Sequence, residues 1–131
     1  MERLVYRSRA LWPDPETAMD DILRDSLWNN ARGRITGALG FSGRTYVQLL
    51  EGPTASLDDL LAKLAADPRH TDLTILVRAP VSGRLVPGWT MARADLAAAS
   101  PRVTDLLTSG DGLALAALLA NLVHQGETGV A

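Results

Sequence analysis

The feature that most constrains this fold is the order in which strand and helix patterns follow one another along the chain. The segments with a strand pattern are residues 2–8, 35–41, 45–51, 73–77 and 85–91. One helical pattern begins at Asp14-Pro15 after the first strand, and a second one ends at Asp67-Pro68 before the fourth strand. A turn at Ser82-Gly83 separates the last two strands, so the predicted order is β-α-β-β-α-β-β.

This order predicts an α+β sandwich of the ferredoxin-like kind, with a five-stranded mixed sheet and two helices on one face. In that topology the first and third strands lie side by side in the middle of the sheet. The chain from about residue 95 reads as helical, with a last helix that Asp111 caps and that runs to Gly126. We expect residues 1–94 to form the sandwich and residues 95–131 a helical extension, which covers the sheet or makes a dimer contact.

The composition leaves little chemistry to the side chains alone. The 131 residues include no cysteine and 2 histidines, which excludes disulfides and thiolate chemistry and argues against any metal site. A net charge of -2 provides no basic field for nucleic acid or an anionic membrane, and no apolar run reaches the ~18 residues that span a bilayer. We expect a cytoplasmic protein that binds neither nucleic acid nor membrane.

Polar side chains occur where the first predicted helix is expected to be buried. At about 100° per residue, the apolar stripe through Ile22 also carries Ser26 and Asn30, with Asn29 at its edge. An asparagine that faces a core needs partners for both its carbonyl and its amide nitrogen. The alternative is that the two asparagines simply end the helix ahead of Gly33.

The third strand raises the same question at Gln48. Residues 46–50 are apolar on both faces of a central strand except at this glutamine, and Tyr6 lies in the expected neighbouring strand. Trp89 and Met91 occupy one face of the last predicted strand. Each of these residues alone is typical of ordinary core packing. Together they point toward one space between the sheet and its first helix, and they predict a polar lining in an apolar pocket.

Motifs in register along the chain resemble those of the BLUF domains, the "blue light using FAD" sensors. They are Leu4-Val5-Tyr6-Arg7-Ser8, Ser26-Leu27-Trp28-Asn29-Asn30, Ile35-Thr36-Gly37, Val47-Gln48-Leu49-Leu50-Glu51-Gly52-Pro53, Asp67-Pro68-Arg69-His70 and Trp89-Thr90-Met91. The resemblance runs in order from about Glu2 to Arg93.

The resemblance implies a blue-light receptor that holds FAD, or alternatively FMN, without a covalent bond. In this family the flavin ring inserts between the two helices on one face of the sheet. Tyr6 would be the light-driven electron donor, and Gln48 would bridge the Tyr6 hydroxyl and the flavin. Trp89 or Met91 would sense the switch beside Gln48.

The remaining site residues follow from the same resemblance. Asn30 and Asn29 would bond the carbonyl and N3 edge of the flavin ring. The other expected cofactor contacts are Ser8, Ser26 and Ile22 around the ring and, more loosely, Lys63, Arg69 and His70 near the phosphates. The resemblance also implies that the chain is not an enzyme, that it signals to a downstream protein partner and that it forms a homodimer.

Two other functions compete with this interpretation. A ferredoxin-like interaction module that has lost its flavin would be colourless, and the intact Tyr6, Gln48 and Asn30 argue against it. A small hydrolase of the acylphosphatase type shares the element order but needs a glycine-rich loop with arginine after the first strand. Residues 8–12 contain no glycine, so this second alternative is disfavoured.

Overall fold

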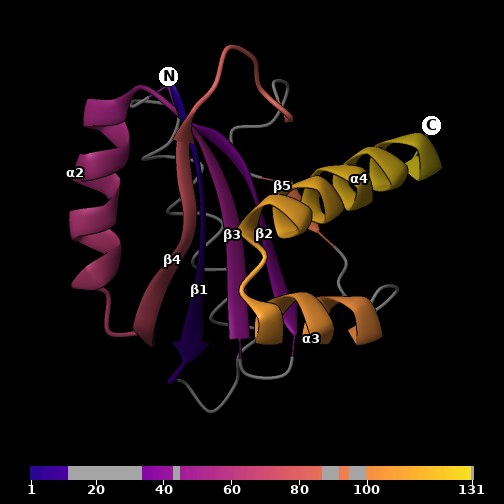
Figure 1. Cartoon of the computed structure of the whole chain (residues 1–131), viewed down its shortest axis with the longest axis horizontal. Helices are drawn as coiled ribbons and strands as arrows, with labels where there is room; N and C mark the ends of the chain where they lie inside the picture. Colours follow the sequence, from indigo (N-terminus) through magenta and orange to yellow (C-terminus); the bar gives the residue numbers. More distant parts are fainter. Residues whose placement is uncertain (12–33, 43–44, 87–91, 95–99, 131) are drawn as a thin grey trace.

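The described part of the chain forms a sheet with helices on both of its faces (Figure 1). The structure is a computed structural model, and it describes residues 1–11, 34–42, 45–86, 92–94 and 100–130. Its elements are β1 (Glu2–Ala10), β2 (Thr36–Ser42), β3 (Thr45–Gly52), α2 (Thr54–Ala65), β4 (His70–Pro80), β5 (Ala92–Ala94), α3 (Ser100–Ser109) and α4 (Gly112–Val130). The predicted α+β class is confirmed.

The strands lie in the order β4-β1-β3-β2-β5 across the sheet. β1 pairs with β3 and with β4, and β2 pairs with β3, all of them antiparallel. The short β5 pairs with β2 in the parallel sense. As the sequence predicted, the first and third strands are neighbours inside the sheet.

Alternation along β1 and β3 divides the interior into two cores, one on each face of the sheet. The core on the α2 face consists of Leu4, Tyr6, Ala10, Ile35, Leu39, Tyr46, Leu50, Leu57, Leu60 and Leu64. The core on the opposite face consists of Val5, Ala38, Val47, Leu49, Val86, Val103, Leu115, Ala116, Leu118, Leu119, Ala120 and Val123. A strand whose side chains are buried on both faces reads as a nearly continuous apolar run, which explains the composition of β3.

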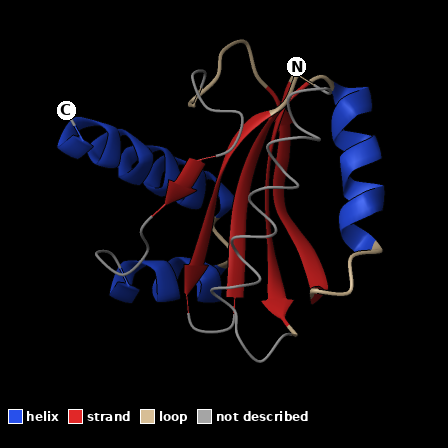
Figure 2. Cartoon of the chain, turned by 180° about the vertical axis from the view of Figure 1, so that it is seen from behind, coloured by secondary structure: helices blue, strands red, loops and turns tan. Residues whose placement is uncertain are grey.

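The C-terminal helices cover the sheet face opposite to α2 (Figure 2). Asp111 caps α4, because its Oδ1 accepts a hydrogen bond from the backbone N–H of Ala114 at 3.0 Å. The helix continues past the predicted end at Gly126 to Val130, since an internal glycine such as Gly126 or Gly129 costs only about 1 kcal/mol of helix stability. None of the helices in the described residues combines the length and the apolarity that crossing a membrane requires.

The predicted strand at residues 85–91 is wrong at its beginning. Leu85 and Val86 form a bend, because their backbone N–H groups donate to the side chain of Glu51. Residues 87–91 lie outside the described residues, and the strand that follows is β5 at the edge beside β2. The last two strands therefore lie at opposite edges of the described sheet and do not form a hairpin around Ser82-Gly83.

The edge strand β4 pairs irregularly with β1. The register shifts between Val5 and Tyr6 and again between Arg7 and Arg9 of β1. Asp72, in the second irregular part of β4, has a φ of 56°, which an aspartate adopts more readily than most residues. These shifts bend and twist the outer edge of the sheet.

Candidate functional site

The centre of the candidate site is a pair of side chains on the two central strands. Tyr6 of β1 and Gln48 of β3 are directly opposite partners in the antiparallel register. Only 2% of the tyrosine and 1% of the glutamine is exposed. The Tyr6 hydroxyl donates a hydrogen bond to Oε1 of Gln48. The sheet thus brings together the two residues that the sequence analysis placed at the heart of the site.

The burial of Tyr6 determines its protonation state. Removal from water, reinforced by the negative charge of Asp67, raises the pKa of the Tyr6 phenol well above its ordinary value, and Arg69 offsets only part of this effect. The phenol therefore keeps its proton at any physiological pH. It remains a hydrogen-bond donor to Gln48.

A second polar chain lies beside this pair. His70 is 8% exposed and its ring centre lies 6.3 Å from that of Tyr6. Its Nδ1 is 2.6 Å from Oγ of Ser8, and its Nε2 is 2.6 Å from the carbonyl oxygen of Leu64 at the end of α2. A carbonyl only accepts, so this contact places a proton on Nε2. Ser8 and His70 thus link β1 to α2 next to Tyr6.

The other predicted contact residues fall into two groups. Lys63 is exposed in the last turn of α2, and Arg69 forms an ion pair of 2.6 Å with Asp67. Their assignment to the cofactor's phosphates stays a prediction. The predicted site residues that lie outside the described residues are Ile22, Ser26, Asn29, Asn30, Trp89 and Met91.

The sequence analysis assigned no role to Glu51, although it quoted this residue in a motif. Glu51 is 0% exposed, and its carboxylate accepts hydrogen bonds from the backbone N–H groups of Leu85 (2.7 Å) and Val86 (3.1 Å). Arg3 Nε donates to it at 2.8 Å. The sequence did hold a signal for the burial of Glu51. Residues two apart in a strand lie on the same face, so Glu51 shares the face of the buried Leu49 in a central strand.

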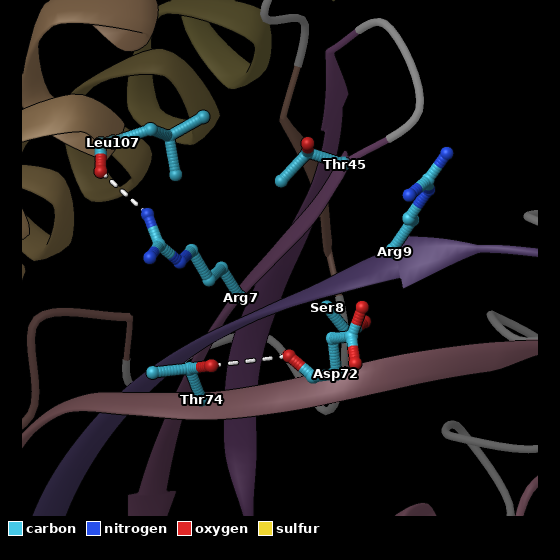
Figure 3. A pocket seen from close by; sticks show the side chains of 7 residues that line it. All are labelled: Arg7, Ser8, Arg9, Thr45, Asp72, Thr74 and Leu107. Atoms are coloured by element: carbon cyan, nitrogen blue, oxygen red, sulfur yellow. Dashed lines mark hydrogen bonds between the residues drawn. The ribbon is translucent and has the colours of Figure 1, made fainter.

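A cavity of about 380 Å³ lies near the C-terminal end of β1, between the sheet and α3 (Figure 3). Arg7 reaches across from β1 and donates a hydrogen bond to the carbonyl oxygen of Leu107 in α3 at 2.6 Å. The residues that line the cavity are Arg7, Ser8, Arg9, Thr45, Asp72, Thr74 and Leu107. Tyr6 and Gln48 are not among them, whereas Ser8, whose Oγ contacts His70, lines this cavity and also belongs to the candidate site.

Solved structures of light-responsive proteins share this fold. The dark-state structure of BlrB, a BLUF protein, matches with a TM-score of 0.81 and 34% sequence identity, over 92% of this chain and 95% of that chain. A bacterial light-regulated adenylyl cyclase matches with a TM-score of 0.75 and 26% identity, over 95% of this chain and 39% of that chain. The fold, which BlrB shares at 34% identity over nearly its whole chain, therefore assigns this chain to the class of light-responsive sensory domains.

Sequence comparisons specify the family. The model of the family BLUF, "Sensors of blue-light using FAD", matches residues 1–92. Photoactivated adenylate cyclase subunit beta of Euglena longa is 35% identical over 108 residues, which are 80% of this chain and 13% of that protein. The chain thus spans only a small part of the curated relatives that it matches. It belongs to the BLUF family of flavin-binding blue-light sensors.

Proposed function

We propose that this chain is a blue-light photoreceptor that binds FAD, or alternatively FMN, and that signals through the hydrogen bonds of Gln48. The observation that carries the proposal is the buried Tyr6–Gln48 pair on the α2 face of the sheet. A phenol and a carboxamide on a face whose other buried side chains are mostly apolar suit the donors and acceptors at the edge of a flavin ring. The described residues therefore fit the cofactor that the family binds.

The proposed mechanism uses Tyr6 as a reversible donor. A bound flavin would supply the absorption of blue light and an acceptor for one electron and one proton. Tyr6 releases both from its phenol, whose raised pKa holds the proton on the oxygen in the dark, and then takes both back. Gln48 accepts the Tyr6 hydrogen bond in the dark, and its carboxamide is left rotated or tautomerised afterwards. Tyr6 recovers its electron and its proton in every cycle and no substrate is consumed, so the cycle is a switch and the chain is not an enzyme.

Residues both inside and outside the described part complete the proposed cofactor site. Asn29 and Asn30 bond the polar edge of the ring, while Ile22, Ser26 and Ser8 line it. Lys63, Arg69 and His70 contribute near the phosphates. These assignments rest on the resemblance of the sequence to the family.

The proposed output leaves through the C-terminal part of the chain. Residues 1–94 form the sensory unit, Trp89 or Met91 responds to Gln48, and residues 95–131 relay the change to a partner protein or to a second copy in a homodimer. The packing of α3 and α4 on the sheet supports this route, since their core includes side chains of β1 and β3. A related structure in which this fold is part of a bacterial light-regulated adenylyl cyclase supports a protein effector as the receiver of the signal. A cytoplasmic location belongs to the same proposal.

Absorption spectroscopy tests the proposal directly. The purified protein, supplied with FAD, should show a flavin band that shifts slightly to the red after a blue flash and relaxes in darkness. Tyr6→Phe and Gln48→Leu should abolish the shift while flavin stays bound. Tyr46→Phe is the matched control, because it removes another buried phenol from the same face of the sheet and should leave the shift intact. A colourless protein that takes up no flavin would favour the flavin-free interaction module.

A further inference from the structure

The carboxylate of Glu51 holds a segment that is distant in sequence against the central strand. A carboxylate with no exposure is tolerated only when its oxygens are fully hydrogen-bonded. Both oxygens accept from Leu85 N–H, at 2.7 and 3.0 Å, and one accepts from Val86 N–H at 3.1 Å. The ion pair with Arg3 of β1 completes the set.

Arg84 forms a second attachment between the same segment and the sheet. Its guanidinium donates to the main-chain oxygen of Glu51 at 2.6 Å and to Oγ1 of Thr36 in β2 at 2.8 Å. It also donates to the carbonyl oxygen of Arg34 at 2.9 Å. Residues 84–86 are therefore tied to β3 in both directions, by a side chain of β3 and by a side chain of their own.

The held segment also belongs to the core of the C-terminal helices. Val86 is 0% exposed and packs in the cluster that contains Val103 of α3 and Leu115 of α4. Gln48 lies on the same strand as Glu51, three residues earlier, and its side chain is on the opposite face of the sheet. On its own face Glu51 contacts the backbone N–H of Val86, whose side chain packs in the core of the C-terminal helices. The geometry connects the light-sensitive face of β3 to the face that carries α3 and α4.

We propose that Glu51 is a positioning residue that couples the switch at Gln48 to the C-terminal helices. This inference rests on the proposed photoreceptor function. When the hydrogen bonds of Gln48 rearrange, any displacement of β3 moves the buried carboxylate with it. The amides of Leu85 and Val86 follow, because they donate to that carboxylate, and Val86 carries the displacement into the core of α3 and α4. The segment 84–86 also precedes Trp89 and Met91 by a few residues in the chain. The same attachment to Glu51 therefore serves the proposed response of Trp89 or Met91 and the proposed response of α3 and α4.

Hydrogen exchange of the full chain, loaded with FAD and measured in darkness and under blue light, tests this coupling. In the wild type the amides of Leu85 and Val86 should exchange slowly in darkness, and light should change exchange in 84–86, α3 and α4. Glu51→Gln replaces one carboxylate oxygen with an NH₂ group, which cannot accept the hydrogen bonds that the backbone N–H groups of Leu85 and Val86 donate. It should speed dark exchange of both amides by about tenfold or more, given the usual strength of hydrogen bonds to charged groups. It should also abolish the light-induced difference in α3 and α4 while the flavin red shift persists.

The control is Glu2→Gln. Glu2 lies beside Arg3 in β1 and its carboxylate forms an ion pair of 2.9 Å with Arg78, but among the described residues it makes no contact that attaches residues 84–86 to the sheet. This variant should leave both the red shift and the helix response unchanged. Arg84→Ala, which keeps the buried carboxylate, should weaken the helix response and serves where Glu51→Gln does not fold. A wild-type red shift without any response in α3 and α4, or a full response in Glu51→Gln or in Arg84→Ala, overturns the coupling. Absence of the red shift in the wild type refutes the photoreceptor function itself.

Discussion

Removing the two polar groups of the Tyr6–Gln48 pair, singly and together, measures the interaction energy between these two side chains. Both side chains are at most 2% exposed, so water cannot replace a lost partner. In Gln48→Leu the Tyr6 hydroxyl loses its acceptor, and a buried unsatisfied group costs about 1–3 kcal/mol. Tyr6→Phe removes the donor and should lower the free energy of unfolding by about 1 kcal/mol.

The double variant should be less destabilised than the sum of the two single variants. Replacing both partners by apolar groups of similar shape leaves neither of them unsatisfied, so the coupling energy should be about 1 kcal/mol or more. The assay is urea unfolding in darkness with saturating FAD, followed by far-ultraviolet circular dichroism. Additive effects, with a coupling energy under about 0.5 kcal/mol, would refute the reasoning that the buried hydrogen bond joins these residues energetically.

Three further predictions concern the frame around the site. Gly112→Ala should lower the free energy of unfolding by about 1–3 kcal/mol, because an added Cβ would lie 2.7 Å from Cγ1 of Val77; urea unfolding that shows a gain would contradict this. Asp111→Ala should cost about 0.5–2 kcal/mol by removing the cap of α4, and an unchanged melting curve would count against the cap. Burial alone would raise the pKa of Asp67, but the hydrogen bonds from Arg69 outweigh it and hold this pKa below its ordinary 3.8. The charged form therefore stabilises the fold above that value, and its contribution is lost as the pH falls through the lowered pKa. Asp67→Asn should weaken the dependence of the melting temperature on pH below about pH 4, and an unaltered acid profile would disprove it.

The parts of the fold that follow from short-range patterns could be predicted from the sequence. Strict alternation along a strand puts the neighbours Val5 and Tyr6 on opposite faces, and the two cores show this division. The element order made β1 and β3 neighbours, and that is why Tyr6 and Gln48 could be expected to meet. Asp111 was recognisable as a cap because capping depends only on adjacent residues.

The parts that depend on long-range hydrogen bonds could not be predicted in the same way. Leu85 and Val86 have the composition of a strand, but the carboxylate of Glu51 takes the N–H groups that a sheet ladder would use. No local pattern shows which amides a buried glutamate will find. The pairing of β5 with β2 was missed for the same reason, since the chain reaches that edge only after the bend that Glu51 holds.

The irregular edge of the sheet has a consequence for how copies of this protein can associate. A long, flat edge strand invites pairing with a strand of another molecule, and uncontrolled pairing of this kind leads to aggregation. In β4 the two register shifts and the left-handed Asp72 break the even row of donors and acceptors that such pairing needs. The irregular edge of β4 therefore disfavours uncontrolled strand-to-strand pairing between copies of this protein.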